Sequence, residues 1–272
     1  MSFVRTIASA AFAVTLFVAP AFSQTSTTTP STTTKPKSTT STAAKPPAKT
    51  SAPAYDRTLL KPALLKDTAP DTYQVKFETT RGDFTVTVTR AWAPLAADRF
   101  YNLVKHHYFD NARFFRVVPG FVVQFGINAQ PAVNAAWDKA TIKDEPVTQK
   151  NKRGTLTFAK TAMPNSRTVQ IFINLKDNSS LDSQGFAPFG VVDDKGMNVV
   201  EMMYDQYGDS AGLDQQAMEK GGEQYISAKW PKLDTIRTAY LIGAAAEAAA
   251  KKPATAAPKP QPKPVAPSKP QN

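Results

Sequence analysis

One stretch decides how this 272-residue sequence is interpreted: Phe114-Phe115-Arg116-Val117-Val118-Pro119-Gly120-Phe121-Val122-Val123-Gln124-Phe125-Gly126. The pattern predicts two apolar strands joined by a Pro-Gly turn. One arginine, Arg116, and one glutamine, Gln124, stand among aromatic and branched residues. Burying a cation costs free energy unless the cation is paired or has a task. We therefore expect Arg116 either to serve a site or to form a structural ion pair.

Two later runs have the same apolar character and could line the same pocket. They are Gly154-Thr155-Leu156-Thr157-Phe158-Ala159 and Val169-Gln170-Ile171-Phe172-Ile173-Asn174. Each has the length and the β-branched and aromatic content of a buried strand. The aromatic and aliphatic residues of all three runs could also be ordinary core residues, because most such residues are buried packing.

Alternation and turn residues predict further strands around these runs. We expect strands at 73–79 and 84–89, joined through Arg81-Gly82-Asp83, and others at 113–118, 121–126, 155–159, 169–174, 188–192 and 235–242. A helix is predicted to begin at Pro94, and a second one to span residues 198–207. A third helical patch, at 213–229, is interrupted by Gly221-Gly222. This pattern by itself indicates a mostly β barrel or sandwich.

The two ends of the chain have a different composition. Residues 1–23 carry Arg5, a short apolar run and small residues at Ala21 and Ser23, which is typical of a secretory signal peptide. An uncleaved anchor is the alternative, because the apolar run is of marginal length. Residues 24–60 (rich in Thr, Pro and Lys) and 244–272 (rich in Ala, Lys and Pro) predict disordered linkers, which leaves residues 61–243 as the folded domain.

The formal net charge of +11 belongs mostly to these ends. The predicted signal peptide carries +1 and the two linkers carry +4 each, which leaves +2 for residues 61–243. The composition therefore does not indicate a nucleic-acid-binding face; the basic tails are expected to act as spacers or to contact anionic envelope surfaces. The sequence has no cysteine, which excludes disulfides, thiolate chemistry and a lipid anchor on a cysteine.

Taken together, the three runs resemble the cyclophilin family of peptidyl-prolyl cis-trans isomerases, and the resemblance extends over residues 73–241. It implies a closed eight-stranded antiparallel barrel capped by two helices. The patch at 213–229 resembles a C-terminal helical insertion found in an exported bacterial branch of the family.

The resemblance also implies the roles of individual residues. Arg116 matches the catalytic arginine through the pattern Phe-x-Arg-x-x-Pro-Gly-Phe, and Gln124 matches the glutamine that orients this arginine and touches the substrate backbone. The expected substrate-binding residues are Phe121, Val122, Ala159, Lys160, Gln170, Phe172, Leu181 and Phe186. No cofactor and no metal ion are implied.

Four positions depart from the family pattern. Val122 stands where methionine is usual, and Lys160 where asparagine is usual. Ser180 replaces a tryptophan, which implies weak cyclosporin binding. The histidine expected after Leu181-Asp182 is missing, and Phe186 is expected to close the pocket in its place.

The predicted function is acceleration of X-Pro isomerisation during folding of exported proteins, with unfolded or loop segments that contain proline as partners. The expected location is the periplasm or the extracellular space, and the expected state is a monomer without stable membrane insertion after cleavage. One alternative is a catalytically weak module that binds proline peptides as a chaperone. Another is a structural or attachment role of the basic tails.

Overall fold

A computed structural model describes residues 55–246 of the chain. The predicted signal peptide, the linker up to residue 54 and the tail from residue 247 lie outside the described residues. Within the described range, no helix has the length and apolar character needed to cross a membrane. The folded region begins before the predicted boundary at residue 60, because the short 3-10 helix Arg57–Leu60 buries Leu59 against the domain. The indole Nε1 of Trp137 donates a hydrogen bond of 2.8 Å to the Leu59 carbonyl.

One antiparallel sheet of eight strands forms the centre of this domain. Its strands are β1 (Thr72–Thr79), β2 (Asp83–Thr89), β3 (Arg116–Val118), β4 (Val122–Phe125), β5 (Thr155–Phe158), β6 (Ile171–Asn174), β7 (Pro188–Val192) and β8 (Ile236–Ile242). The strand order is β3-β4-β6-β5-β7-β2-β1-β8. Every predicted strand is present, with ends that differ from the prediction by up to three residues.

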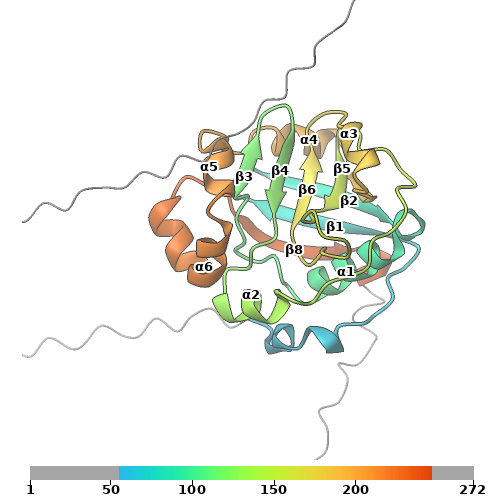
Figure 1. Ribbon diagram of the computed structural model, residues 1–272, viewed down its shortest axis with the longest axis horizontal. Coiled ribbons are helices and arrows are strands. Elements are labelled where there is room, and N and C mark those ends of the chain that lie inside the picture. Colours follow the sequence, from blue (N-terminus) through green and yellow to red (C-terminus); the bar gives the residue numbers. More distant parts are fainter. Residues whose placement is uncertain (1–54, 247–272) are drawn as a thin grey trace, which may run out of the picture. The chain divides into compact units, whose positions relative to one another are not determined.

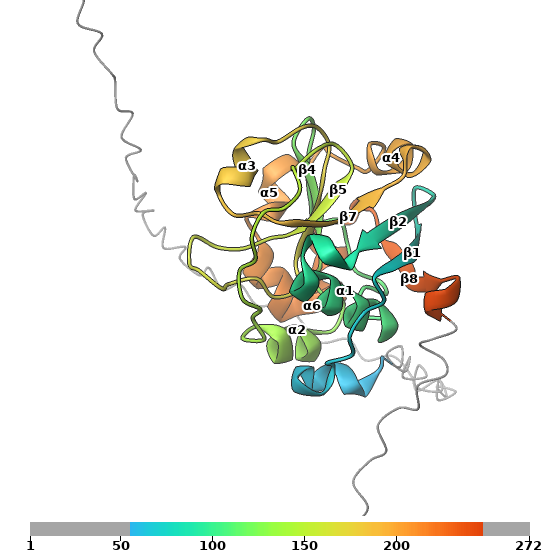
Figure 2. The same cartoon turned by 90° about the vertical axis from the view of Figure 1, so that its right-hand side faces the viewer.

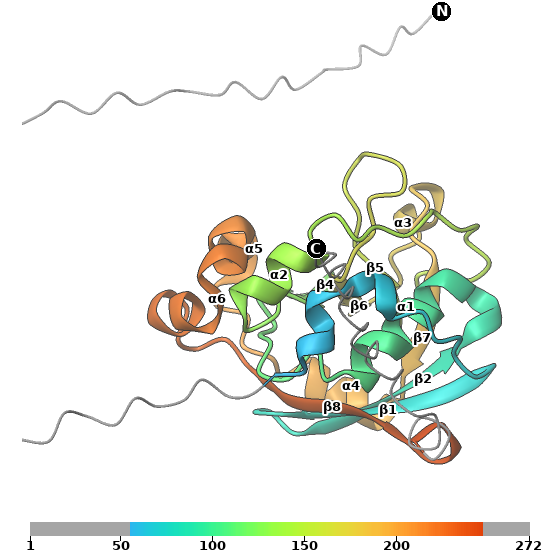
Figure 3. The ribbon, with the colours of Figure 1, turned by 90° about the horizontal axis from the view of Figure 1, so that it is seen from below.

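The sheet curls so that β1, β2 and β8 cross behind β3, β4, β6 and β5 (Figures 1 and 3). The two end strands, β3 and β8, do not pair with each other along their lengths. An isolated antiparallel bridge joins Arg113 to Thr235, in the segments that lead into those strands. The prediction of eight antiparallel strands is confirmed, but the closed barrel is not: the sheet is curled and open at this seam.

The helices lie around the curled sheet (Figure 2). They are α1 (Pro94–Lys105), α2 (Pro131–Trp137), α3 (Ser180–Ser183), α4 (Asp194–Val200), α5 (Gly208–Gly212) and α6 (Gln215–Lys229). The helix predicted at 198–207 is wrong in its bounds. It begins at Asp194 because the Asp193 side chain accepts a hydrogen bond from the Gly196 amide and caps the first turn.

Helix α6 is interrupted where the sequence predicts it. Gly222 has φ of 58° and ψ of −153°, so two helical pieces meet there at a kink. A side chain at this position would lie 2.4 Å from the Ala129 carbonyl oxygen, so glycine is required both by conformation and by space.

Two separate groups of buried residues hold these elements together. The main core fills the curled sheet with packed aromatic rings, and Phe77 alone contacts four other phenylalanines. A second cluster attaches α5 and α6 to the approach of β3. Its buried members are Phe115, Ile127, Ala211, Met218, Ile226 and Leu233. The helical segment 208–229 is therefore docked on the β3 side of the sheet through its own small core (Figure 1).

Candidate active site

The β3–β4 hairpin places the two polar residues of the deciding stretch side by side. Its turn contains Gly120 with φ of 66°, a conformation that favours glycine. The register then sets Arg116 opposite Gln124, and the next strand pair sets Gln124 opposite Phe172. Three predicted site residues from three strands therefore lie in one row across the sheet.

An apolar pocket lies beside this row and has a cavity volume of about 180 Å³. It is lined by Arg116, Phe121, Val122, Gln124, Ala159, Lys160, Phe172, Leu181 and Phe186. Val122, Phe172 and Leu181 are buried and form a hydrophobic cluster of their own, separate from the main core. The structure thus brings together nine of the ten predicted site residues, in a surface hollow rather than in the domain interior.

Phe186 forms one wall of the pocket. Its ring meets that of Phe172 edge-on, with centroids 5.6 Å apart. The loop that carries it is held from below by Asn151, whose amide nitrogen donates to the Phe186 carbonyl at 2.9 Å and to Asp182 at 2.8 Å. Phe186 therefore lies in the wall of the pocket, in a loop that these hydrogen bonds hold in place.

Arg116 stands at the mouth of the pocket with contacts on three sides. Its Nη1 donates to Gln124 Oε1 at a long 3.4 Å, and its guanidinium carbon lies 5.6 Å from the centre of the Phe121 ring. On the third side, its Nε donates to Asp209 of α5 at 2.6 Å. Since the Asp209 side chain is 59% exposed, solvent screens this ion pair. The structural ion pair that the sequence allowed for Arg116 is present, with Asp209 as the partner. The same arginine also lines the pocket.

The tenth predicted residue, Gln170, lies next to the pocket. It lines an adjoining hollow of about 280 Å³ together with Gln124, Ala159 and Lys160. Gln124 Nε2 donates to Gln170 Oε1 at 2.8 Å, and Gln170 Nε2 donates to Glu219 of α6 at 3.2 Å. A chain of side-chain hydrogen bonds thus runs from Arg116 to a carboxylate on α6.

Lys160 extends over the boundary between the two hollows. Its Nζ lies 5.6 Å from the centre of the Phe186 ring. None of the residues that line either hollow is acidic, and Lys160 has no ion-pair partner within the described range 55–246.

Sequence reasoning missed three residues at this site: Asp209, Glu219 and Gln215, the last of which lines the second hollow. All three come from the helical segment 208–229. Their only sequence signal was an acid or amide in a helical patch, and no local pattern shows which face of such a patch docks on β3.

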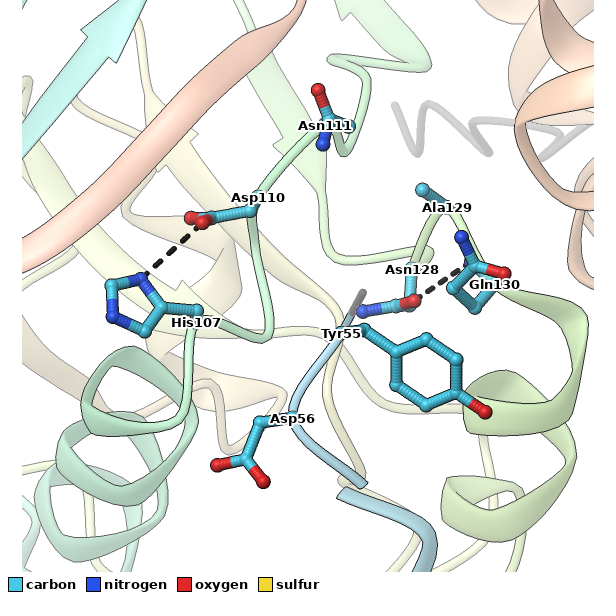
Figure 4. Close-up of a pocket in the computed structure, with 8 residues that line it drawn as sticks. All are labelled: Tyr55, Asp56, His107, Asp110, Asn111, Asn128, Ala129 and Gln130. Carbon is cyan, nitrogen blue, oxygen red and sulfur yellow. Dashed lines mark hydrogen bonds and ion pairs between the residues drawn. The ribbon is translucent and has the colours of Figure 1, made fainter. Parts of the chain in front are cut away.

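A different pocket, of about 390 Å³, lies at the end of α1 (Figure 4). It is lined by Tyr55, Asp56, His107, Asp110, Asn111, Asn128, Ala129 and Gln130. Its polar groups already engage one another: His107 pairs with Asp110 at 3.3 Å, and the Gln130 amide donates to Asn128. None of the ten predicted site residues lines this pocket, so the Arg116 pocket is the candidate active site.

The family model and the two relatives described in this paragraph are all peptidyl-prolyl cis-trans isomerases by name. A family model described as "Cyclophilin type peptidyl-prolyl cis-trans isomerase/CLD" matches residues 74–221. A peptidyl-prolyl cis-trans isomerase of Acinetobacter baylyi is 32% identical over 171 residues, which cover 60% of this chain and 88% of the relative. Peptidyl-prolyl cis-trans isomerase B of Escherichia coli is 36% identical over 135 residues, or 47% of this chain and 81% of the relative.

Solved structures include a cyclophilin type peptidyl-prolyl cis-trans isomerase of Cryptosporidium parvum. It matches with a TM-score of 0.46 and 21% identity, over 63% of this chain and 98% of that one. The same protein, solved in the presence of the dipeptide Ala-Pro, matches with a TM-score of 0.45.

Proposed function

The chain belongs to the cyclophilin-type family and is a peptidyl-prolyl cis-trans isomerase. We propose that it isomerises the X-Pro bond in the Arg116 pocket. The observation that carries this proposal is the convergence of one arginine and an apolar slot formed by Val122, Phe172 and Leu181. The slot binds the proline ring, and the arginine acts on the bond next to it.

The chemistry needs no nucleophile. The X-Pro bond turns slowly because its partial double-bond character gives a barrier of about 18–20 kcal/mol. In the twisted state the proline nitrogen becomes pyramidal and gains a lone pair. A guanidinium fixed beside the slot stabilises this state more than the planar one, and such differential binding lowers the barrier.

The rest of the pocket holds the substrate for that step. Gln124 accepts from Arg116 and donates to Gln170, so its orientation is set from both sides. Ala159 and Lys160 lie where the residue before proline would run along the end of β5. Phe186 covers the slot and shields the proline ring from water.

A second candidate function is a chaperone module that binds proline peptides with little catalysis. Two observations favour it: Ser180 stands where the family resemblance implies tryptophan, and no histidine follows Leu181-Asp182. The intact row of Arg116, Gln124 and Phe172 favours the enzyme.

We further propose that the enzyme acts on exported proteins. The support is the sequence of residues 1–23, which has the pattern of a secretory signal peptide. By the same reasoning, α6 forms the C-terminal insertion of an exported bacterial branch, since it fills most of the region 213–229 where the sequence resembles that insertion.

Titration of the isotope-labelled protein with a proline peptide, followed by NMR, tests the site assignment. Amide shift changes should concentrate at residues 121–124, 159–160, 172 and 181–186, and exchange between cis and trans peptide signals should accelerate. Shift changes centred on the pocket of Figure 4 would contradict the assignment. Shift changes at the expected residues without faster exchange would favour the chaperone module.

A further inference from the structure

We propose that the helical segment 208–229 is the positioning element of the active site, in which Asp209 and Glu219 fix the Arg116 guanidinium from two sides. This inference rests on the proposed role of Arg116 and extends it to residues outside the sheet. Neither carboxylate lines the Arg116 pocket, so both are positioning residues rather than catalytic ones.

Asp209 acts directly on the arginine. Its carboxylate accepts from Nε at 2.6 Å. Because Nε is the inner nitrogen of the guanidinium, this bond fixes the rotation of the group and leaves the two outer nitrogens directed elsewhere. One of these, Nη1, reaches Gln124. Solvent screens the attraction between the two charges, so this bond acts mainly through its direction, which holds Nε toward α5.

Helix α5 also restricts the position of the Arg116 side chain through close packing. Gly212 lies against the aliphatic part of Arg116, and a Cβ built on it would stand 2.6 Å from Cδ, 2.9 Å from Cγ and 3.1 Å from Cβ of that side chain. Gly212 is buried and has no positive φ. The absence of a side chain therefore serves close approach to Arg116 rather than backbone conformation.

Glu219 acts through the two glutamines. A carboxylate can only accept, so it orients the Gln170 amide with its nitrogen toward α6 and its oxygen toward Gln124. Gln124 must then present its nitrogen to Gln170 and its oxygen to Arg116. The carboxylate at one end of this chain can only accept and the guanidinium at the other end can only donate, so together they hold both amides in a single orientation.

The segment is anchored firmly enough for this role. The Asn134 side chain donates to the Glu219 carbonyl at 3.1 Å, and the Glu223 amide donates to the Ala129 carbonyl at 2.9 Å. The Glu223 carboxylate also pairs with Arg113, just before β3. Helix α6 is therefore attached both to α2 and to the segment that leads into β3.

Titration of Glu219 provides a specific readout. Burial raises the pKa of Glu219 above its ordinary 4.5, Asp138 raises it further, and the hydrogen bond from Gln170 opposes the shift. The other charged or titratable groups that face it are Lys220 and Tyr108. Protonation turns the carboxylate into a group that also donates, so the orientation of Gln170 is lost as the pH falls through this pKa.

The test measures kcat and KM separately, by NMR line-shape analysis of a proline peptide, for D209A, D209E and E219Q. We expect D209A to lower kcat about ten-fold with little change in KM, and D209E to restore more than half of the lost rate. E219Q is expected to lower kcat about three-fold at pH 7, and the fall in kcat that we expect for the unchanged chain at low pH should be absent from this variant. Asp205→Asn is the matched control, since Asp205 lies three residues before the segment and its side chain accepts a hydrogen bond from Gln206.

Stability separates positioning from a structural role. A folded-state pKa above the unfolded value means that the ionised Glu219 costs folding free energy above that pKa, so E219Q should unfold at the same temperature as the unchanged chain or higher at pH 7. A loss of kcat without a loss of stability supports positioning. Unchanged kcat in both D209A and E219Q would overturn the inference.

Double variants that include R116A separate the role of Arg116 itself from its positioning by Asp209 and Glu219. If Arg116 is the group being positioned, D209A and E219Q have no further effect on an R116A background. An R116A variant of full activity would refute the proposed role of Arg116 itself. An inactive R116A with unaffected D209A and E219Q would refute the positioning alone.

Discussion

The replacement Gly212→Ala changes the active site without touching any charge or any hydrogen-bonding group. The new methyl group would stand 2.6 Å from Arg116 Cδ, about 0.8 Å inside the ordinary van der Waals range that begins at 3.4 Å. The atoms that it meets are in the stem of the side chain, so Arg116 cannot avoid it by moving only its tip. Either the arginine or α5 must shift by a similar distance.

A displacement of about 1 Å in a catalytic group costs up to ~100-fold in rate, and sharing the shift between Arg116 and the short helix α5 reduces this to about 10–30-fold. Stability should change little, because alanine favours helix over glycine by about 1 kcal/mol, which offsets part of the clash. The assay is kcat/KM on an Ala-Pro peptide without a coupled protease, together with the thermal midpoint of unfolding. Exposed Ser210→Ala on the same helix is the control. A folded Gly212→Ala protein with full activity would refute the reasoning that α5 and Arg116 share one fixed position.

Three further predictions concern specificity and stability. Lys160 has no ion-pair partner among residues 55–246, and the proposed substrate path brings the residue before proline close to it. A Glu-Pro peptide should therefore be isomerised about three-fold faster than a Lys-Pro peptide, and Lys160→Asn should abolish this ratio. An unaltered ratio in the variant would exclude Lys160 as its source. Burial tends to raise the pKa of Asp56, but hydrogen bonds, above all with His106, bring it below 3.8. The stability that this pairing contributes is therefore present above the unfolded-state pKa of Asp56 and is lost as the pH falls through its folded-state pKa. Asp56→Asn should speed amide exchange at residues 57–60 about five-fold at pH 7 and should have no effect at a pH where Asp56 is protonated. Equal exchange rates in the two proteins at pH 7 would contradict this. Gly126 has φ of +118°, and a Cβ at this position would lie 2.5 Å from the Val169 carbonyl oxygen. Gly126→Ala should therefore lower the free energy of unfolding by ~3 kcal/mol or more, measured by urea titration. A loss under 1 kcal/mol would show that the backbone at Gly126 and Val169 can move apart.

Strands were the most predictable part of this fold. Alternation in 73–79 and 84–89 and the apolar runs around Arg116 and Phe172 each predict a strand that the structure contains. These signals are local, since they depend on the two-residue period of a pleated strand. The closure of the sheet is not local, because it depends on how far β3 and β8 are kept apart, and here the prediction of a closed barrel is not confirmed.

The family resemblance predicts which residues lie at the pocket, but nothing in the sequence predicts which residues hold Arg116 in position. Arg116, Gln124 and Phe172 belong to adjacent strands, so their register brings them into one row. Asp209 and Glu219 reach the same row from helices far along the chain. Their positions depend on the second hydrophobic cluster around Phe115 and on tertiary hydrogen bonds, which leave no periodic pattern in the sequence.

The central claim is that a fixed guanidinium beside an apolar slot lowers the barrier to isomerisation of the X-Pro bond. The variant Arg116→Ala tests this claim most directly. The measurement is protease-free prolyl isomerisation on a panel of X-Pro peptides, with Arg153→Ala as the control, since Arg153 pairs with Glu201 and does not line the pocket. The account predicts a loss of kcat/KM of at least ~100-fold for Arg116→Ala, with peptide binding and the folded state retained. Full catalysis by the Arg116→Ala protein would contradict it.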